Sequence, residues 1–261
     1  MTARVLLCAV VVALAPGLPV RLLAAQTPTP AGDENAAPPT GNATGGNAAS
    51  RLLRDELSDY RNFFSWSNAE WLGFGGLAAL AAHPADEPIH EHVVAEGTST
   101  YPGAYTYGSQ YFQVPLALVV WMAGHAADSD RTADTGRDLL RAQIAVFSWT
   151  NAIKWTAQRT RPNGDPRGFP SGHASASFAT AAVLQEHYGW KIGVPAMAAA
   201  AYTAASRVAA DEHWLSDVIF GASLGLVCGR TVTVRFRQQK VVISPIGVAG
   251  GGGVLLSVVN P

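Results

Sequence analysis

The sequence contains little cysteine and little charge. Its 261 residues include two cysteines, Cys8 and Cys228, and charged residues make up 14% of the chain against 48% hydrophobic residues. Cys8 lies in an N-terminal apolar run that we expect to be removed, so no intrachain disulfide is expected. The formal net charge of −1 gives no basic excess, and we therefore expect no nucleic-acid partner.

Long apolar runs are also missing from the body of the chain. Spanning a bilayer takes about 20 apolar residues, whereas the run at 174–184 ends at Gln185 and the run at 218–229 ends at Arg230. We favour a water-soluble or interface-bound helical bundle with membrane-surface contact. The alternative is an integral membrane protein whose functional site faces the periplasm.

The N-terminus has the features of a secretory signal peptide. Arg4 precedes an apolar run at 5–14, and small residues follow at Ala24 and Ala25. A basic start, a short apolar run and a small-residue exit are typical of such a peptide. We expect residues 1–25 to be removed, which takes the net charge from −1 to −3 because two basic residues and no acidic ones are lost. The mature protein is then exported to the periplasm or another extracytoplasmic compartment.

The remaining chain divides into three parts by composition. Residues 26–50 are rich in Pro, Gly, Ala, Asn and Thr and predict a disordered linker. Residues 51–230 show helical apolar spacing, interrupted by an irregular Pro- and Gly-rich segment at 83–108 that we expect to cover a site or a bundle end. Residues 231–261 alternate and are rich in β-branched side chains. We therefore predict an all-α bundle of about six helices with a small C-terminal β-hairpin.

A turn that leads into a helix is the first candidate site. Pro170 and Gly172 disfavour a helix interior, whereas the Ala-rich residues 174–187 suit a helix well. The free N–H groups and the positive dipole end of a helix N-terminus can bind an oxyanion. Ser171 adds a hydroxyl and His173 an imidazole at the same point. Taken alone, this pattern also fits an ordinary helix cap.

The second candidate is a pair of cations. Lys154 and Arg161 lie seven positions apart, about two helical turns, so they share a face if the helix continues to Pro162. Together they can hold an oxyanion. Cations that stabilise a helix C-terminus are the simpler interpretation, and Arg159 fits that interpretation equally well.

The third candidate is an imidazole paired with a carboxylate. His213 and Asp217 are four apart, which on a helix brings the carboxylate within reach of the ring, and Arg207 adds a third cation. A carboxylate that holds one ring nitrogen leaves the other free to attack or to accept a proton. An ordinary surface ion pair is the competing interpretation. In a chain with few charges, burying all of these groups without a purpose would be costly, and the combination favours binding and attacking a tetrahedral oxyanion.

The three segments resemble the signature of the type 2 phosphatidic acid phosphatase and vanadium haloperoxidase superfamily. That signature reads Lys, six residues, Arg-Pro; then Pro-Ser-Gly-His; then Ser-Arg, five residues, His, three residues, Asp. It is matched in order over residues 154–217 by Lys154, Arg161, Pro162, Pro170, Ser171, Gly172, His173, Ser206, Arg207, His213 and Asp217. The spacing of seven residues between Pro162 and Pro170 is shorter than in the secreted acid phosphatases of the family and looks more like its bacterial lipid-type members.

The resemblance implies a metal-independent phosphatase that acts on a phosphomonoester or diphosphate, soluble or lipid-linked, through a phosphohistidine. It implies no cofactor and no metal ion. His213 would be the nucleophile, Asp217 its orienting carboxylate and His173 the acid that protonates the leaving oxygen. The groups that would hold the phosphoryl oxygens are Lys154, Arg161, Ser171, Gly172 and Arg207.

Two other functions stay open at this point. A vanadate-dependent haloperoxidase would use the same oxyanion pocket, and a non-catalytic phosphate-ester-binding protein would keep the pocket without turnover. His90, Glu91 and His92 carry alternating donors, but the sequence shows no further ligand at a suggestive spacing. The leaving group and the oligomeric state are not specified by the sequence.

Overall fold

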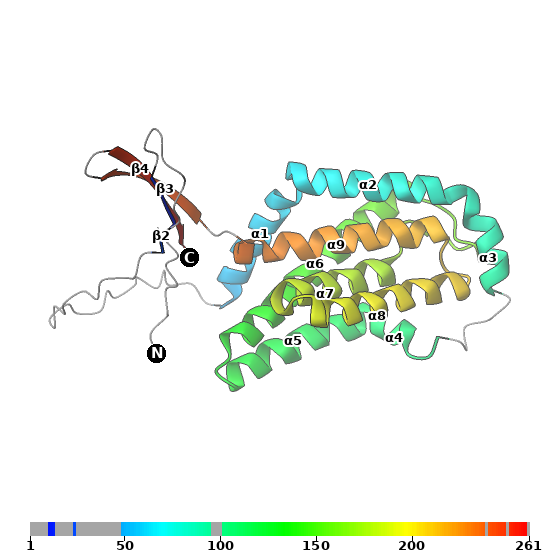
Figure 1. The fold of residues 1–261 in the computed structure, drawn as a ribbon. Helices are drawn as coiled ribbons and strands as arrows, with labels where there is room; N and C mark the ends of the chain where they lie inside the picture. Colours follow the sequence, from blue (N-terminus) through cyan, green and yellow to red (C-terminus); the bar gives the residue numbers. More distant parts are fainter. Residues whose placement is uncertain are drawn as a thin grey trace. The chain divides into compact units, whose positions relative to one another are not determined.

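The computed structural model describes residues 48–94 and 101–237 and four strands (Figure 1). The predicted all-α fold is confirmed. The described helices outnumber the six or so expected; they are α1 (Ala48–Phe63), α2 (Trp66–Ala82), the 3-10 turn η1 (His83–Ala85), α3 (Asp86–Val94), α4 (Ala104–Gly108), α5 (Gln110–Ala126), α6 (Asp130–Ala157), α7 (Gly172–Tyr188), α8 (Trp190–Ala209) and α9 (Leu215–Arg237). Two compact units result, one formed by Gly46–Val234 and the other by both chain ends.

The unit formed by the chain ends is a small antiparallel sheet. Its strands are β1 (Val10–Ala13), β2 (Leu23–Ala24), β3 (Lys240–Val248) and β4 (Gly251–Val259), in the order β2-β1-β4-β3. β3 and β4 pair from Lys240 opposite Val259 to Val248 opposite Gly251, which is a hairpin. Most of the predicted signal peptide and linker lies outside the described residues. α1, however, already begins within the last residues assigned to the linker.

The hairpin begins later than the sequence predicts, because residues 231–237 continue α9. The Thr231 hydroxyl donates to the carbonyl of Val227 and the Thr233 hydroxyl to that of Gly229, each four residues earlier. Val232 between them is 1% exposed in the core. The β-branched residues that predict a strand are thus accommodated in a helix by burial and by hydroxyl bonds to the preceding turn.

The Pro-rich segment 83–108 is also more regular than predicted, since it contains η1, α3 and α4. Pro84 lies in the first positions of η1 and Pro88 in the first turn of α3. A helix makes no use of the N–H group at those positions, so proline is tolerated there. His90, Glu91 and His92 therefore lie on a helix, and the described residues contain no group of three or more metal donors placed to hold an ion.

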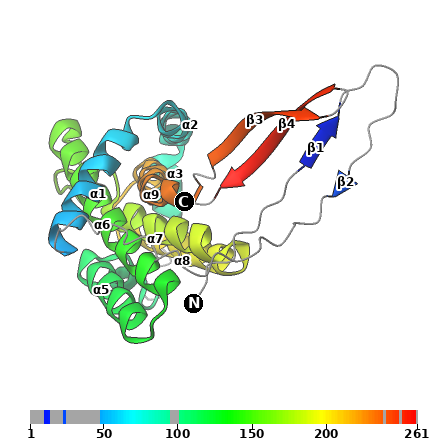
Figure 2. The same ribbon diagram turned by 90° about the vertical axis from the view of Figure 1, so that its left-hand side faces the viewer.

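Helix α7 lies inside the bundle and packs on α6 and α8 (Figures 1 and 2). On another side α9 approaches it closely through Gly221, Gly225 and Gly229. A Cβ atom added at these positions would lie 2.7, 2.3 and 2.6 Å from α7 backbone atoms. Glycine every fourth residue therefore lets the two helix backbones touch along about two turns of α9. This contact fixes the start of α9 against the start of α7.

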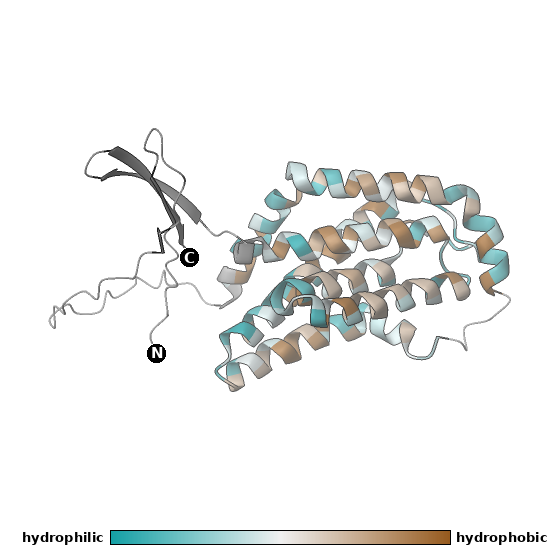
Figure 3. Cartoon of the chain, viewed as in Figure 1, coloured by the Kyte–Doolittle hydropathy of each residue, from teal (hydrophilic) through white to brown (hydrophobic). Residues whose placement is uncertain are grey.

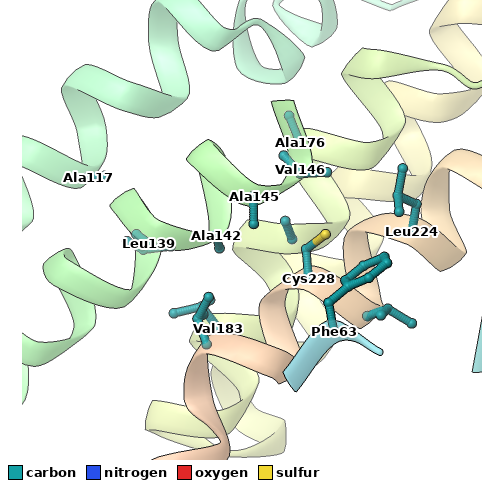
Figure 4. Close-up of a cluster of buried hydrophobic side chains, with 13 residues drawn as sticks. Phe63, Ala117, Leu139, Ala142, Ala145, Val146, Ala176, Val183, Leu224 and Cys228 are labelled. Carbon is teal, nitrogen blue, oxygen red and sulfur yellow. The ribbon is translucent and has the colours of Figure 1, made fainter. Parts of the chain in front are cut away.

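The core between these helices is built mainly from small side chains (Figure 4). Ala142, Ala176 and Ala179 are fully buried where α6 and α7 meet, and Phe63 from α1 stacks on Trp149 at a ring distance of 4.4 Å. Alanine allows short distances between helix axes, so polar groups at the helix ends can be held close together.

A buried ionic network joins α1, α6 and α7. Arg141 is 1% exposed and donates to both carboxylate oxygens of Asp59, at 2.8 and 2.6 Å, and to Asp138 at 2.7 Å. Asp138 also lies 3.1 Å from His187 Nε2. This guanidinium is therefore paired on two sides by carboxylates from different helices.

Large apolar side chains are exposed along α2 and α5 (Figure 3). On α2 the exposed fractions are 81% for Trp66, 70% for Phe74 and 68% for Leu80. Within the described helices, Leu215–Thr233 of α9 is the segment long and apolar enough to cross a membrane, but 61% of that window is buried in the protein. An apolar patch of this size on a surface is typical of contact with a membrane or a partner.

Candidate active site

The three candidate segments meet at one end of the helical bundle, where the α8–α9 loop lies beside α3 (Figure 1). Lys154, Gly172 and His173 line one cavity of about 490 Å³. Arg207 lines a neighbouring cavity of about 290 Å³, and Tyr105 of α4 borders both.

The imidazole and the carboxylate do not share a helix as the spacing predicts. His213 lies in the turn before α9, and Asp217 is in the first turn of α9. Nδ1 of His213 lies 3.5 Å from Oδ2 of Asp217, longer than a formed N–H···O hydrogen bond. The same Oδ2 accepts the Trp214 N–H at 3.0 Å, which caps the helix start. The cap brings the residues just before α9 close to the Asp217 carboxylate, so His213 and Asp217 meet. A small movement of the His213 ring would complete the hydrogen bond.

Lys154 and Arg161 also differ from the prediction of a shared helical face. Helix α6 ends at Ala157, followed by Gln158 in the left-handed conformation with φ 49°. The Lys154 ammonium is held by the carbonyls of Arg167 at 2.7 Å and Gly168 at 3.3 Å. Arg161 reaches the site from the following loop and pairs with Glu212. Glu212 also lies 3.7 Å from Arg207, so one carboxylate faces both arginines.

The predicted helix N-terminus is confirmed. Ser171 is the N-cap of α7 and its hydroxyl accepts from the Ala174 N–H at 3.5 Å. Its own N–H donates to the Asp217 carbonyl at 3.0 Å, so the starts of α7 and α9 are joined. A Cβ atom at Gly172 would meet Thr150 at 3.8 Å, an ordinary contact. The fold therefore does not itself require glycine at this position, which agrees with a need for close approach by a ligand.

Burial and like charge lower the pKa values of the basic groups here. Burial, followed by Arg207, His213, Arg161 and Lys154, lowers the pKa of His173 to about 3. Burial lowers the pKa of His213 to about 4, against the opposing attraction of Asp217. Burial and Arg161 lower the pKa of Lys154 to about 8. Burial is the largest cause of each shift, and the neighbouring cations add to it, so a bound anion would offset the part that comes from those cations.

Unpartnered polar atoms give a second indication of an anion. Among the described residues, buried atoms without a hydrogen-bond partner include Nε of Arg161, Nε2 of His173, Nε of Arg207, Nδ1 of His213 and Oγ1 of Thr150. Buried polar atoms are normally satisfied, so a group of them around one site indicates a missing ligand rich in acceptors. A tetrahedral oxyanion has that chemistry.

Several residues at the site carry no spacing signal in the sequence. Asp86 and Arg159 bond to the start of α9, Glu212 pairs with the arginines, and Tyr105 lies against His173 at a ring distance of 5.0 Å. From the sequence, Arg159 was considered as a cation that stabilises a helix C-terminus, and Glu212 stands out only because it precedes His213.

The chain can now be compared with known proteins. Residues 138–240 match the model of the PAP2 superfamily. This segment is similar to the PAP2 superfamily. It contains residues 138–157 of α6 and the whole of α7, α8 and α9, and therefore every residue of the three candidate segments.

Two curated relatives resemble this chain in sequence. Lipid A 1-phosphatase of Porphyromonas gingivalis is 36% identical over 123 residues, which covers 44% of this chain and 27% of the relative. Lipid A 4'-phosphatase of Helicobacter pylori is 34% identical over 79 residues, covering 30% of this chain and 40% of the relative. The chain thus spans less than half the length of either relative.

The PAP2 fold extends beyond the matched segment. The crystal structure of a transmembrane PAP2 type phosphatidylglycerolphosphate phosphatase from Bacillus subtilis superimposes with a TM-score of 0.54 and 20% identity. The superposition covers 73% of this chain and 96% of that one. The likeness establishes the shared helical fold.

Proposed function

We propose that this protein is a phosphatase that hydrolyses a lipid-linked phosphate ester through a phosphohistidine. The observation that carries the proposal is the group of unsatisfied donors and cations around His213, whose ring faces a fully buried carboxylate. Both curated relatives bear the names of lipid A phosphatases, which supports the same reaction class here.

In the first step, Nε2 of His213 attacks the phosphorus, and the bond from phosphorus to the leaving oxygen breaks. The Nδ1 proton points to Asp217, whose negative charge stabilises the imidazolium that forms. His173 gives its proton to the leaving oxygen. Lys154, Arg161, Arg207, the Ser171 hydroxyl and the Gly172 N–H hold the three remaining oxygens as charge redistributes.

In the second step, water attacks the phosphohistidine. His173, now neutral, accepts a proton from that water, and phosphate leaves as the bond from nitrogen to phosphorus breaks. His173 is neutral at pH 7 in the phosphate-free pocket, because its pKa is lowered to about 3. A phosphoryl dianion beside it opposes the repulsion from the neighbouring cations and raises that pKa, so His173 can take up from solvent the proton that it donates to the leaving oxygen.

A lipid-linked substrate agrees with the surroundings of the pocket. The cavity beside His173 is lined by the aromatic rings of Tyr105, Tyr111 and Phe147. The exposed apolar faces of α2 and α5 would contact the bilayer that holds such a substrate. We place this contact on the extracytoplasmic side, in line with the signal peptide expected at residues 1–25.

The test is a substrate panel on the purified full chain in mixed micelles. We expect phosphate release from lipid A and phosphatidylglycerolphosphate to exceed release from p-nitrophenyl phosphate, and we expect it to persist in excess EDTA. Rapid acid-free quenching should trap phosphate on wild-type protein and none on His213→Ala. Faster turnover of the soluble ester would overturn the lipid assignment, and full loss in EDTA would overturn the metal-independent mechanism.

Membrane contact is tested separately by fractionation. We expect the protein in the membrane fraction on the extracytoplasmic side, accessible to protease in spheroplasts. Release by carbonate would identify an interface-bound protein, whereas retention would identify an integral one. Recovery in the cytoplasm would contradict the export prediction.

A further inference from the structure

Helix α3 lies against the segment that carries His213, and one of its faces makes all the contacts. Asp86 and His90 are one turn apart on this face. Asp86 is 4% exposed and accepts the Ser216 N–H at 2.8 Å and the Ser216 hydroxyl at 2.6 Å. His90 Nε2 lies 3.0 Å from Asp211, and its ring lies 5.3 Å from that of Trp214. Both ends of the turn around His213 are therefore bound to α3.

Arg159 connects Asp86 with Asp217. Its Nη2 donates to Oδ2 of Asp86 at 2.7 Å, and its Nη1 donates to Oδ1 of Asp217 at 2.6 Å. Nη1 also lies 2.7 Å from the Ser216 hydroxyl. One guanidinium is thus shared by two carboxylates, each of which takes one of its terminal nitrogens.

The sharing determines which oxygen of Asp217 faces His213. Oδ1 is engaged by Arg159, and Oδ2 faces the Trp214 N–H and Nδ1 of His213. A guanidinium that binds a single carboxylate usually contacts both of its oxygens in a bidentate arrangement. Asp86 prevents this bidentate arrangement because it occupies Nη2 of Arg159. Oδ2 of Asp217 therefore stays available to the imidazole of His213.

We propose that Asp86 and Arg159 are positioning residues for the nucleophile, acting on His213 through Asp217. This inference rests on the proposed function and deepens it. Arg159 is one of the six unspecified residues between Lys154 and Arg161 of the signature, whereas Asp86 lies outside the three matched segments and α3 outside the segment matched by the family model. The groups that face His213 from the other elements are Lys154 of α6, Arg161 of the following loop and His173 of α7.

Two variants separate positioning from a merely structural role because they should act in opposite directions. In Asp86→Asn, Arg159 is free to bind both oxygens of Asp217, which withdraws Oδ2 from His213. We expect the pKa of His213 to fall and kcat to drop by about 10- to 100-fold, the usual range for supporting residues around a reactive centre. In Arg159→Gln, Asp217 loses a competing cation, so the pKa of His213 should rise.

The measurement is the pH dependence of kcat/KM, together with imidazole ¹⁵N shifts of His213 assigned with His213→Ala. Inhibition by inorganic phosphate should change less than threefold in both variants, because the oxyanion-holding cations are untouched. Asp134→Asn, on the surface of α6, is the matched control and should leave all three readouts unchanged. Thermal melting confirms that each variant is folded.

Shifts in the same direction for both variants, or no shift in either, would overturn the positioning role. A loss of phosphate inhibition in parallel with thermal stability would show that α3 only supports the fold. The two proposals fail separately. Absence of turnover by the wild-type protein on the whole panel would reject the phosphatase, whereas the His213 titration tests Asp86 and Arg159 without any turnover.

Discussion

The helical unit buries charge in two places, and α6 contributes to both. At its C-terminal end, Lys154 joins Arg161 and Arg207 in a site where cations exceed carboxylates. About 20 Å earlier along the same helix, Arg141 lies among carboxylates from α1 and α6. The first group leaves donors unsatisfied, whereas Arg141 is bonded on both sides. The donors of the first group are open to a ligand, as the proposed function requires, whereas the second group joins α1 to α6.

The largest expected effect removes the nucleophile from the cation-rich site. His213→Ala should reduce phosphate release by at least about 10⁴-fold, as expected when a group acting in covalent catalysis is lost. The fold should persist, because the protonated form of this buried ring is disfavoured and contributes no stabilising ion pair at neutral pH. Phosphate-release assays and circular dichroism check both parts. Activity within tenfold of the wild type would refute the assignment.

The opposite result is expected at Arg141, in the middle of α6. Arg141→Ala leaves two buried carboxylates without their cation and should lower the free energy of unfolding by about 3–5 kcal/mol. The kcat of the protein that remains folded should be unchanged, because Lys154 is not displaced. Denaturant titration and active-site-normalised rates test the prediction. The double variant Arg141→Ala with Asp59→Ala serves as the control and should recover part of the loss.

A smaller effect is expected from Glu212, a carboxylate that faces two arginines of the site. Glu212 pairs with Arg161 and lies near Arg207, so a phosphoryl group must displace it. Glu212→Gln should strengthen inhibition by inorganic phosphate about 3- to 10-fold, consistent with a half-exposed ion pair. Glu70→Gln, on the exposed face of α2, is the charge-matched control. Weaker inhibition would mean that Glu212 orients the arginines for phosphate instead of competing with it.

The smallest expected effect concerns Glu56, which interacts with Asp59 and Arg141 of the buried ionic network. Burial and the nearby Asp59 raise the pKa of Glu56 from 4.5 to about 7. The folded state therefore holds this proton more tightly than the unfolded state, so the stabilisation is complete below pH 4.5 and is lost as pH rises through 7. Glu56→Gln should raise the Tm by about 2–4 °C at pH 8 and leave it unchanged at pH 4.5. An equal change at both values would contradict the titration.

The sequence predicted the helical class and, from residue spacing, side chains that the fold brings to one end of the bundle. It did so for the wrong local reason in two cases. Lys154 and Arg161 meet across a helix end at Gln158, and His213 meets Asp217 across a capped turn. Residues only four or seven positions apart stay close in space whether a helix or a turn connects them. The predicted pairs therefore meet even though the local structure differs.

Contacts between distant segments could not be read in the same way. Asp86 reaches Ser216 across 130 positions, and its segment looks irregular because helix-starting prolines cannot be told from helix-breaking ones without knowing where the helix begins. The extension of α9 over residues 231–237 was missed because β-branched residues favour strands until burial decides otherwise.

The glycine contacts between α7 and α9 have a consequence for which residues these helices tolerate. The Ser171 amide is bonded to Asp217, and a Cβ atom at Gly221, Gly225 or Gly229 would lie within 2.7 Å of a backbone oxygen, so a larger residue would push the helix starts at the site apart. The cavities beside His173 are bordered instead by α4. There Gly103 supplies a left-handed turn with φ 77° and Tyr105, 62% exposed, stands over His173.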